Sequence, residues 1–240
     1  MTIVPPERII NQESFRTDQA ILDFSVYRLM EEERYLFPRY YRAGDTLLDL
    51  ACGLGRTTLL LHEMGLRVRG VDQSPAFIGL AQRRFPYLDF QIGSYDEIHE
   101  ADASFDHVLI SFNGIDYAFP EQQRKTALAE CVRVLKPGGT LIVSSHNIKS
   151  LHWFSPYYNF LRLGWKLRNC LRAFRDHGYI LEDGVYAFYA SAGYVIQQVE
   201  EYGLRCVERR CGVRLHIPAL DRYFAPYIHY VFRKPGGAAQ

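Results

Sequence analysis

The sequence has no long apolar run. No stretch reaches the roughly 18 residues that a membrane-spanning helix requires. The first residues, MTIVPPERIINQESF, lack the basic start and the apolar segment of a signal peptide. We therefore expect no transmembrane segment and a cytoplasmic location.

An excess of one charge and paired cysteines are also absent. Basic residues number 28 and acidic residues 27, so the net charge is +1. No overall field draws such a chain to nucleic acid or to an anionic membrane, although a local basic patch is compatible with this balance. The five cysteines form no CxxC pair. We expect reduced thiols that pack in the interior, and we predict no metal site.

What the sequence does contain, between about residues 45 and 145, is an alternation of short apolar runs and helical stretches. Predicted strands cover 46–51, 67–72, 88–93, 105–112 and 140–146. Predicted helices cover 56–65, 74–85 and 120–135, the second with Ser74 as its N-cap and the third stopped by residues 136–139. This alternation is typical of a parallel sheet covered on both faces.

The two flanks of this region differ from it. Residues 1–44 are predicted to form a helical cap, with five aromatic residues available to pack over the sheet: Phe24, Tyr27, Tyr35, Phe37 and Tyr40. Residues 148–190 are rich in aromatic and basic residues, and we interpret them as an insertion. A helix over 191–203 and strands over 204–211 and 227–234 then return to sheet-like sequence.

Four features fall where the predicted parallel strands end, the edge at which such sheets bind ligands. The first is the turn from Asp49 to Gly55, whose glycines let backbone approach a ligand. Asp72 ends the next strand and is placed to accept hydrogen bonds from ribose. The pair Ser94 and Tyr95 follows the third strand, and the segment ISFNGIDY at 110–117, in which Asn113 and Asp116 interrupt an apolar run, stands at the end of the fourth. Together they indicate a nucleoside site.

Each feature also has a structural explanation. The glycine turn is compatible with a tight connection between strand and helix, Asp72 with a helix cap, and Asn113-Gly114 with an ordinary turn. The pair Gly53 and Gly55 is not followed by the third glycine of a GxGxxG fingerprint, which argues against NAD or FAD.

Four segments resemble, in order, the sequence blocks of class I S-adenosylmethionine-dependent methyltransferases: LLDLACGLGR, GVDQSPAFIGLAQRR, FDHVLISFNGIDYAF and RVLKPGGTLIVSS. The resemblance covers about residues 45–145, and ASAGYVIQQVEEYGLRCVE is similar to the helix and sixth strand that follow in that family. It implies a three-layer, Rossmann-like α/β fold. The sheet would have seven strands, mostly parallel with the last one antiparallel, and residues 45–240 would form the methyltransferase domain.

The resemblance also implies a cofactor, S-adenosyl-L-methionine, and the residues that hold it. Those implied are Asp49, Ala51, Gly53 and Gly55 around its methionine part, Asp72 at the ribose, Gln73, Ser94 and Tyr95 at the adenine, and Ser111, Phe112 and Asn113 near the methionine end. Two positions depart from the usual pattern. Ala51 replaces a glycine, and Ser94 replaces an acid that would accept from the adenine amino group.

The implied reaction is in-line displacement at the sulfonium methyl group, favoured by a dry pocket that aligns the nucleophile. An acceptor that must lose a proton also needs a base. The candidates are Asp116, Tyr117 and His146, with Asn147 next to it. A histidine that ends a strand is often structural, and Asp116 is also a possible helix cap.

The insertion is the expected source of substrate choice. Its aromatic residues are predicted to form a lid over a flat acceptor: Trp153, Phe154, Tyr157, Tyr158, Phe160 and Trp165. Its cations are compatible with a solvated helix face, an anionic acceptor or a membrane surface: Arg162, Lys166, Arg168, Arg172 and Arg175. Stacked bases with these cations would also suit RNA, but the near-zero net charge disfavours a nucleic-acid partner.

We therefore predict methyl transfer to a small molecule, in the biosynthesis of a specialised metabolite. The acceptor would be aromatic or anionic. FNGIDY is similar to a block in methyltransferases that modify amines, which gives nitrogen a slight edge over oxygen or carbon. The alternatives are a protein that binds the cofactor without catalysis, and an enzyme that transfers another group from a related sulfonium. The oligomeric state is not predicted.

Overall fold

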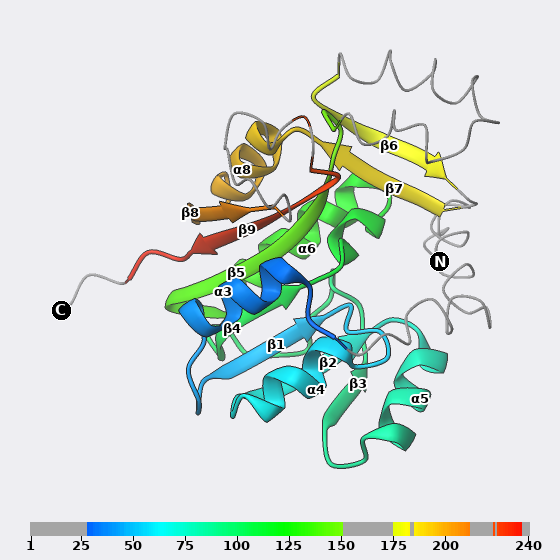
Figure 1. The fold of residues 1–240 in the computed structure, drawn as a ribbon, viewed down its shortest axis with the longest axis vertical. Helices are drawn as coiled ribbons and strands as arrows, with labels where there is room; N and C mark the ends of the chain where they lie inside the picture. Colours follow the sequence, from blue (N-terminus) through cyan, green and yellow to red (C-terminus); the bar gives the residue numbers. More distant parts are fainter. Residues whose placement is uncertain (1–27, 151–174, 183–184, 212–222, 224, 237–240) are drawn as a thin grey trace.

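The computed structural model describes residues 28–150, 175–182, 185–211, 223 and 225–236 (Figure 1). The elements up to the middle of the chain are α3 (Glu31–Tyr40), β1 (Thr46–Leu50), α4 (Arg56–Glu63), β2 (Arg67–Asp72), α5 (Pro75–Arg84), β3 (Asp89–Ile92), β4 (Phe105–Ile110), the 3₁₀ turn η1 (Gly114–Tyr117), α6 (Glu121–Val134) and β5 (Leu135–Asn147). They are followed by β6 (His177–Glu182), β7 (Val185–Ala190), α8 (Ala192–Glu200), β8 (Arg205–Arg210) and β9 (Tyr227–Arg233).

The described strands form one nine-stranded sheet. Strands β3, β2, β1, β4 and β5 lie side by side in this order and are parallel. The last strand, β9, runs antiparallel along β5 from Thr140 to His146, and β8 pairs with its other edge. The predicted α/β fold, mostly parallel with an antiparallel last strand, is confirmed, whereas the described sheet has two strands more than the seven predicted.

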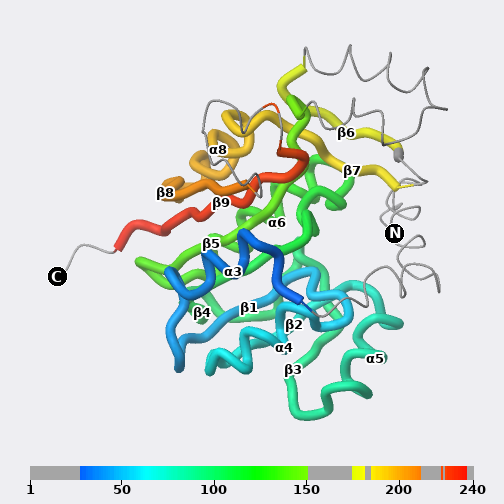
Figure 2. Tube along the Cα trace, in the orientation of Figure 1, coloured from blue at the N-terminus to red at the C-terminus, as the bar shows by residue number. Residues whose placement is uncertain are grey.

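The other two strands come from the predicted insertion. Strands β6 and β7 form an antiparallel hairpin, and β7 adds to the end of β5 in parallel at His146 and Asn147. The hairpin lies at the opposite end of the molecule from β3 (Figure 2). Residues 151–174, which include most of the predicted lid, lie outside the described residues. Arg175 is described and is exposed.

Helices cover both faces of the sheet, as the alternation predicts. On one face, α6 and α8 bury Leu128 and Val195 against β1, β4 and β5. On the other, α3 and α4 bury Phe37 and Leu61 against β1, β4 and β9, and α5 packs on Phe90 of β3. Burial of one large apolar side chain contributes about 1.5–3 kcal/mol, so these contacts fix the helices on the sheet.

The aromatic residues expected to pack in the N-terminal cap are only partly described. Phe37 is fully buried, and Tyr35 and Tyr40 pack partly against the same cluster. Phe24 and Tyr27 lie outside the described residues.

Predicted element boundaries mostly agree with the structure. Ser74 caps α5 by accepting from the Phe77 N–H. One boundary differs: the strand predicted to begin at residue 140 begins at Leu135, directly after the end of α6 at Val134, so the Lys136–Gly139 segment is part of β5. The register of β4 with β5 skips this segment. Its backbone bonds instead to Lys234, which accepts from the Gly138 N–H at 3.0 Å and donates to the Gly139 carbonyl at 2.9 Å.

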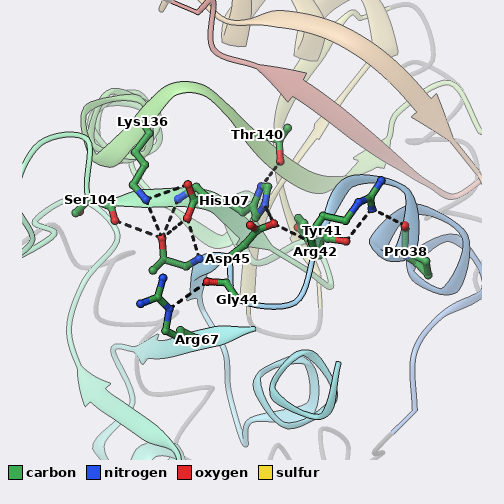
Figure 3. Close-up of polar contacts among 12 residues, drawn as sticks. Pro38, Tyr41, Arg42, Gly44, Asp45, Arg67, Ser104, His107, Lys136 and Thr140 are labelled. Carbon is green, nitrogen blue, oxygen red and sulfur yellow. Dashed lines mark hydrogen bonds and ion pairs between the residues drawn. The ribbon is translucent and has the colours of Figure 1, made fainter. Parts of the chain in front are cut away.

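A polar cluster holds the amino ends of β1, β4 and β5 together (Figure 3). Asp106 accepts from the Thr46 N–H and hydroxyl at 2.9 and 2.6 Å and from Lys136 Nζ at 2.9 Å. Burial raises the pKa of Asp106, but these donors outweigh it and lower the pKa to about 2. The His107 ring bridges Thr140 at 2.8 Å and Asp45 at 2.9 Å. The polar side chains at this edge of the sheet therefore bond to one another.

No helix in the described part of the chain is both long and apolar enough to cross a bilayer. The described cysteines, Cys52, Cys131, Cys206 and Cys211, are free thiols.

Candidate functional site

A cavity of about 770 Å³ opens at the carboxyl ends of β1, β2 and β4. Its size falls within the range of small-molecule sites in proteins. Of the residues predicted to hold the cofactor, those that line it are Ala51, Gly53, Asp72, Gln73, Tyr95, Ser111 and Phe112. The first turn of α3 and the residues before it form a further wall, which includes Arg28 and Arg34.

The loop after β1 is shaped by left-handed backbone. Ala51, Gly53 and Gly55 have φ values of +56°, +56° and +82°. A side chain added at Gly53 would meet only Phe77 Cδ2, at 4.0 Å, so backbone lies open at this point of the cavity wall.

Gly55 has a different reason to be glycine. A Cβ at this position would lie 2.5 Å from Cζ of Phe90, and Gly55 does not line the cavity. The bare backbone here makes room for an aromatic ring of β3. The expectation that Gly55 approaches a ligand is therefore not supported by its position.

Asp72 is nearly buried at the end of β2. Its Oδ2 accepts from the Gly53 N–H at 2.9 Å, and its Oδ1 from the Ser74 N–H at 2.8 Å. A carboxylate has about four acceptor positions, so two are left for the hydroxyls of a ribose. Burial raises the pKa of Asp72, while the two N–H donors oppose the rise. Ser74, and not Asp72, caps α5.

Asp49 lies beneath the cavity and does not line it. Its Oδ2 accepts from the hydroxyls of Thr57 and Thr58, both at 2.7 Å. Its Oδ1 has no hydrogen-bond partner among the described residues, and burial raises its pKa to about 6. The unpartnered oxygen fits a cationic group above the loop, as the cofactor's ammonium would be.

Two further predicted residues make contacts of their own instead of lining the cavity. Ser94 donates from its hydroxyl to Asp96, while its neighbours Gly93 and Tyr95 face the cavity. The N–H of Asn113 donates to Ser144 Oγ at 2.7 Å. The φ of Asn113 is +59°, which turns the chain from β4 into η1.

An ion pair that the sequence did not suggest attaches α3 to this site. Arg56 donates to both carboxylate oxygens of Glu33, at 2.6 and 2.7 Å, and to Ser111 Oγ at 2.9 Å. Ser111 in turn donates to Glu33. Although burial raises the pKa of Glu33, the bonds and charge of Arg56 bring it below its ordinary value. In the sequence, Glu33 is one of three consecutive glutamates at 31–33, and no local pattern distinguishes it from the other two.

The three predicted catalytic residues lie at different depths. Tyr117 lines the cavity. His146 lies behind it, with ring centroids 6.0 Å apart and the two planes perpendicular. Asp116 is fully buried and binds His146, Ser145 and Arg124. Asn147, next along the chain, donates to the Ala225 carbonyl at 2.9 Å and is also buried. Arg124, fully buried on α6, was not identified from the sequence.

Known sequences match the core of this fold. A family model described as a methyltransferase domain matches residues 47–139. The ubiquinone/menaquinone biosynthesis C-methyltransferase UbiE of Rubrivivax gelatinosus is 30% identical over 204 residues, which span 78% of each chain. A demethylmenaquinone methyltransferase of Renibacterium salmoninarum is 36% identical over 115 residues. That alignment spans 48% of this chain and 47% of the relative, or about half of each.

Solved structures share the fold at low identity. A 1,6-didemethyltoxoflavin-N1-methyltransferase of Burkholderia thailandensis, with bound 1,6-didemethyltoxoflavin and S-adenosylhomocysteine, superposes with a TM-score of 0.68 at 16% identity. The match covers 98% of this chain and 92% of that one. Because the sequence match to the R. gelatinosus enzyme extends over most of both proteins, this chain belongs to the class I S-adenosylmethionine-dependent methyltransferases, and its cofactor is S-adenosyl-L-methionine.

Proposed function

We propose that the enzyme methylates a small, flat acceptor that lies between the cofactor and Tyr117. The observation that carries this proposal is that Asp72, with two open acceptor positions, shares one cavity with the rings of Phe112 and Tyr117. Aromatic rings favour flat partners through stacked and edge-on contacts. The cavity thus offers a polar end for the cofactor's ribose and an aromatic end for the acceptor.

The cofactor contacts follow from the same placement. Asp72 would accept from the ribose hydroxyls, and Gln73 and Tyr95 would lie beside the adenine. The open backbone at Gly53 and the unpartnered Oδ1 of Asp49 below it would face the methionine part. We propose that Gly55, Ser94 and Asn113 do not contact the cofactor and instead support the loops that carry the residues named above.

The cofactor supplies a methyl group on a positively charged sulfur. The chain's own part is to hold the acceptor in line with the bond that breaks and to exclude water. The first turn of α3, tied down by Glu33 and Arg56, supports the wall that would shield the reaction. We retain 1–44 as the cap, 45–240 as the methyltransferase domain and 148–190 as the segment that selects the acceptor.

The acceptor atom is the open part of this proposal. Nitrogen is our prediction from the FNGIDY block, whereas the related proteins are named as C-methylating and N1-methylating enzymes. Arg28 and Arg34 line the cavity and are exposed, which supports an anionic group on the acceptor. We place the reaction in the cytoplasm, as expected from the sequence.

The direct assay uses methyl-labelled cofactor and a panel of small acceptors. The panel contains aromatic amines, heteroaromatic N–H compounds, phenols and quinols, each with and without a carboxylate, and products are identified by mass. We expect one added methyl group on an aromatic member. Cofactor binding without turnover over the whole panel would overturn the proposal. A different added mass would do so too, by indicating another transferred group.

A further inference from the structure

Asp116 cannot itself take a proton from an acceptor, because its acceptor positions are filled. Oδ1 accepts from Arg124 Nη1 at 2.8 Å and from Ser145 Oγ at 2.9 Å. Oδ2 accepts from the backbone N–H and the ring Nδ1 of His146, both at 2.7 Å. These donors use the roughly four positions that a carboxylate offers.

The same contacts fix the proton position on His146. The carboxylate of Asp116 is ion-paired with Arg124 and only accepts, so Nδ1 of His146 must carry a hydrogen. In the neutral imidazole, Nε2 then holds the lone pair. Nε2 has no hydrogen-bond partner among the described residues, and the side chain is almost wholly enclosed.

Three aromatic rings hold the imidazole in place. The Tyr189 ring of β7 lies 4.5 Å from it, the Tyr227 ring of β9 5.3 Å, and the Tyr117 ring of η1 6.0 Å, centroid to centroid. Together with Asp116, these side chains face His146 from η1, β7 and β9. Tyr117 alone among them also lines the cavity, so His146 lies one ring away from the place proposed for the acceptor.

Arg124, the cation paired with Asp116, is itself held in place by other residues. Besides Asp116, it donates to Gln198 Oε1 of α8 at 2.9 Å and to the Ile115 carbonyl at 3.0 Å. Its guanidinium lies 4.2 Å from the centre of the Phe188 ring. Because Arg124 is buried and held by these partners, its positive charge stays beside the Asp116 carboxylate and neutralises it.

We propose that Nε2 of His146 is the base that deprotonates the acceptor, and that Asp116 is the positioning residue that sets its tautomer. This inference rests on the proposed function. As the acceptor atom forms its bond to the methyl carbon, the carbon–sulfur bond breaks and its electron pair stays on sulfur. The acceptor's bond to hydrogen breaks, its electron pair stays on the acceptor, and the proton goes to Nε2. One positive charge thus moves from the sulfonium to an imidazolium beside the Asp116 carboxylate.

The proposal restricts the class of acceptor. A base is useful only where the methylated atom, or an atom conjugated with it, has a proton to lose. Phenols, quinols and heteroaromatic N–H compounds meet this condition, whereas a tertiary amine does not. The substrate is therefore inferred to be a flat compound with a weakly acidic O–H or N–H.

The test compares two histidines that each bind an aspartate. His146→Gln is set against His107→Gln, whose ring pairs with Asp45 at 2.9 Å at the opposite edge of the sheet. We expect His146→Gln to lower kcat about 100-fold or more, with cofactor affinity unchanged. His107→Gln should change stability and leave kcat as it is.

Two results would overturn the inference. One is a His146→Gln enzyme with the wild-type kcat. The other is an Nε2–H tautomer for His146 in nitrogen-15 spectra of the wild-type protein, which need no acceptor and no variant. If the wild type methylates nothing in the panel, the proposed function fails instead. Asp116→Asn should lower kcat through the same route, but His146→Gln is the safer variant, because Asp116→Asn leaves Arg124 buried and unpaired.

Discussion

At the scale of single residues, two glycines only two positions apart serve different purposes. Gly53 leaves backbone open at the cavity, whereas the bare Cα of Gly55 accommodates the ring of Phe90. Both have positive φ, so each substitution carries a conformational cost of about 1–2 kcal/mol for the left-handed region. The two substitutions should differ only in what the added side chain does beyond this cost, either to packing or to cofactor binding.

Replacement of each glycine by alanine separates these purposes. Gly55→Ala should lower the free energy of unfolding by more than Gly53→Ala, because its Cβ would lie 2.5 Å from the Phe90 ring. Gly53→Ala should weaken cofactor binding more than Gly55→Ala does. Urea denaturation and calorimetric titration measure the two effects. Equal losses of stability would contradict the assignment of Gly55 to packing.

The carboxylate of Asp72 is predicted to hold the ribose. Asp72→Asn replaces one acceptor oxygen by a donor, which then faces the N–H of Gly53 or Ser74. We expect cofactor affinity to fall about 10- to 100-fold, which corresponds to roughly 1.4–2.7 kcal/mol. Asp89→Asn, a change at the distant amino end of β3, is the control. Unchanged affinity in Asp72→Asn would remove the ribose assignment.

At the scale of elements, α3 is attached to the sheet by apolar burial and by one buried ion pair. Leu36 and Phe37 supply the apolar contacts, and Glu33 joins Arg56 and Ser111. Because the residues next to Glu33 line the cavity, the position of α3 is coupled to the shape of the cofactor site.

Glu33→Gln should both destabilise the fold and weaken cofactor binding. Removal of one partner from a buried ion pair typically costs about 3–5 kcal/mol, because the other charge stays buried. Glu121→Gln is the matched control, since it breaks the exposed pair Glu121–Lys125, which solvent screens. A Glu33→Gln protein as stable as the Glu121→Gln protein would refute this role for the α3 contact.

At the scale of the whole molecule, the sequence predicted what depends on neighbours along the chain. The apolar run of β1 and the N-cap at Ser74 are local signals, and the family blocks located Asp72 and Tyr117. Other features depend on partners far apart in sequence, such as Glu33 with Arg56 and Asp116 with His146, and no single-chain pattern records such pairs. The glycine at position 55 was predicted to approach a ligand, and the structure adds a contact that the sequence does not show, the ring of Phe90 beside its bare Cα.

The response of stability to acid also belongs to the whole fold. Burial lowers the pKa of His107 and of His229, although nearby carboxylates oppose the fall in both cases. The unfolded chain, with histidine pKa values near 6.5, then binds more protons than the folded one. The two histidines should therefore lower the free energy of unfolding as the pH drops below about 6.5. Asp49 acts in the opposite direction, because its pKa, raised to about 6 by burial, lets the folded chain bind a proton before the unfolded chain does. Asp106, whose pKa is lowered to about 2, adds a loss of stability as the pH falls from about 4 toward 2.

His229→Leu isolates one part of this response. Neither ring nitrogen of His229 has a hydrogen-bond partner among the described residues, so an apolar side chain of similar size should be neutral or stabilising at pH 8. Between pH 8 and pH 5 the variant should lose less stability than the wild type. A pH dependence as steep as that of the wild type, in urea denaturation, would show that His229 does not contribute to it.

The central claim is that the cofactor lies between the open backbone at Gly53 and the carboxylate of Asp72. The most direct test is a crystal structure of the chain with S-adenosylhomocysteine. We predict ribose hydroxyls within hydrogen-bond distance of Asp72, the adenine beside Gln73 and Tyr95, and the sulfur facing Tyr117. Density for the nucleoside elsewhere, or none at saturating concentration, would contradict the account.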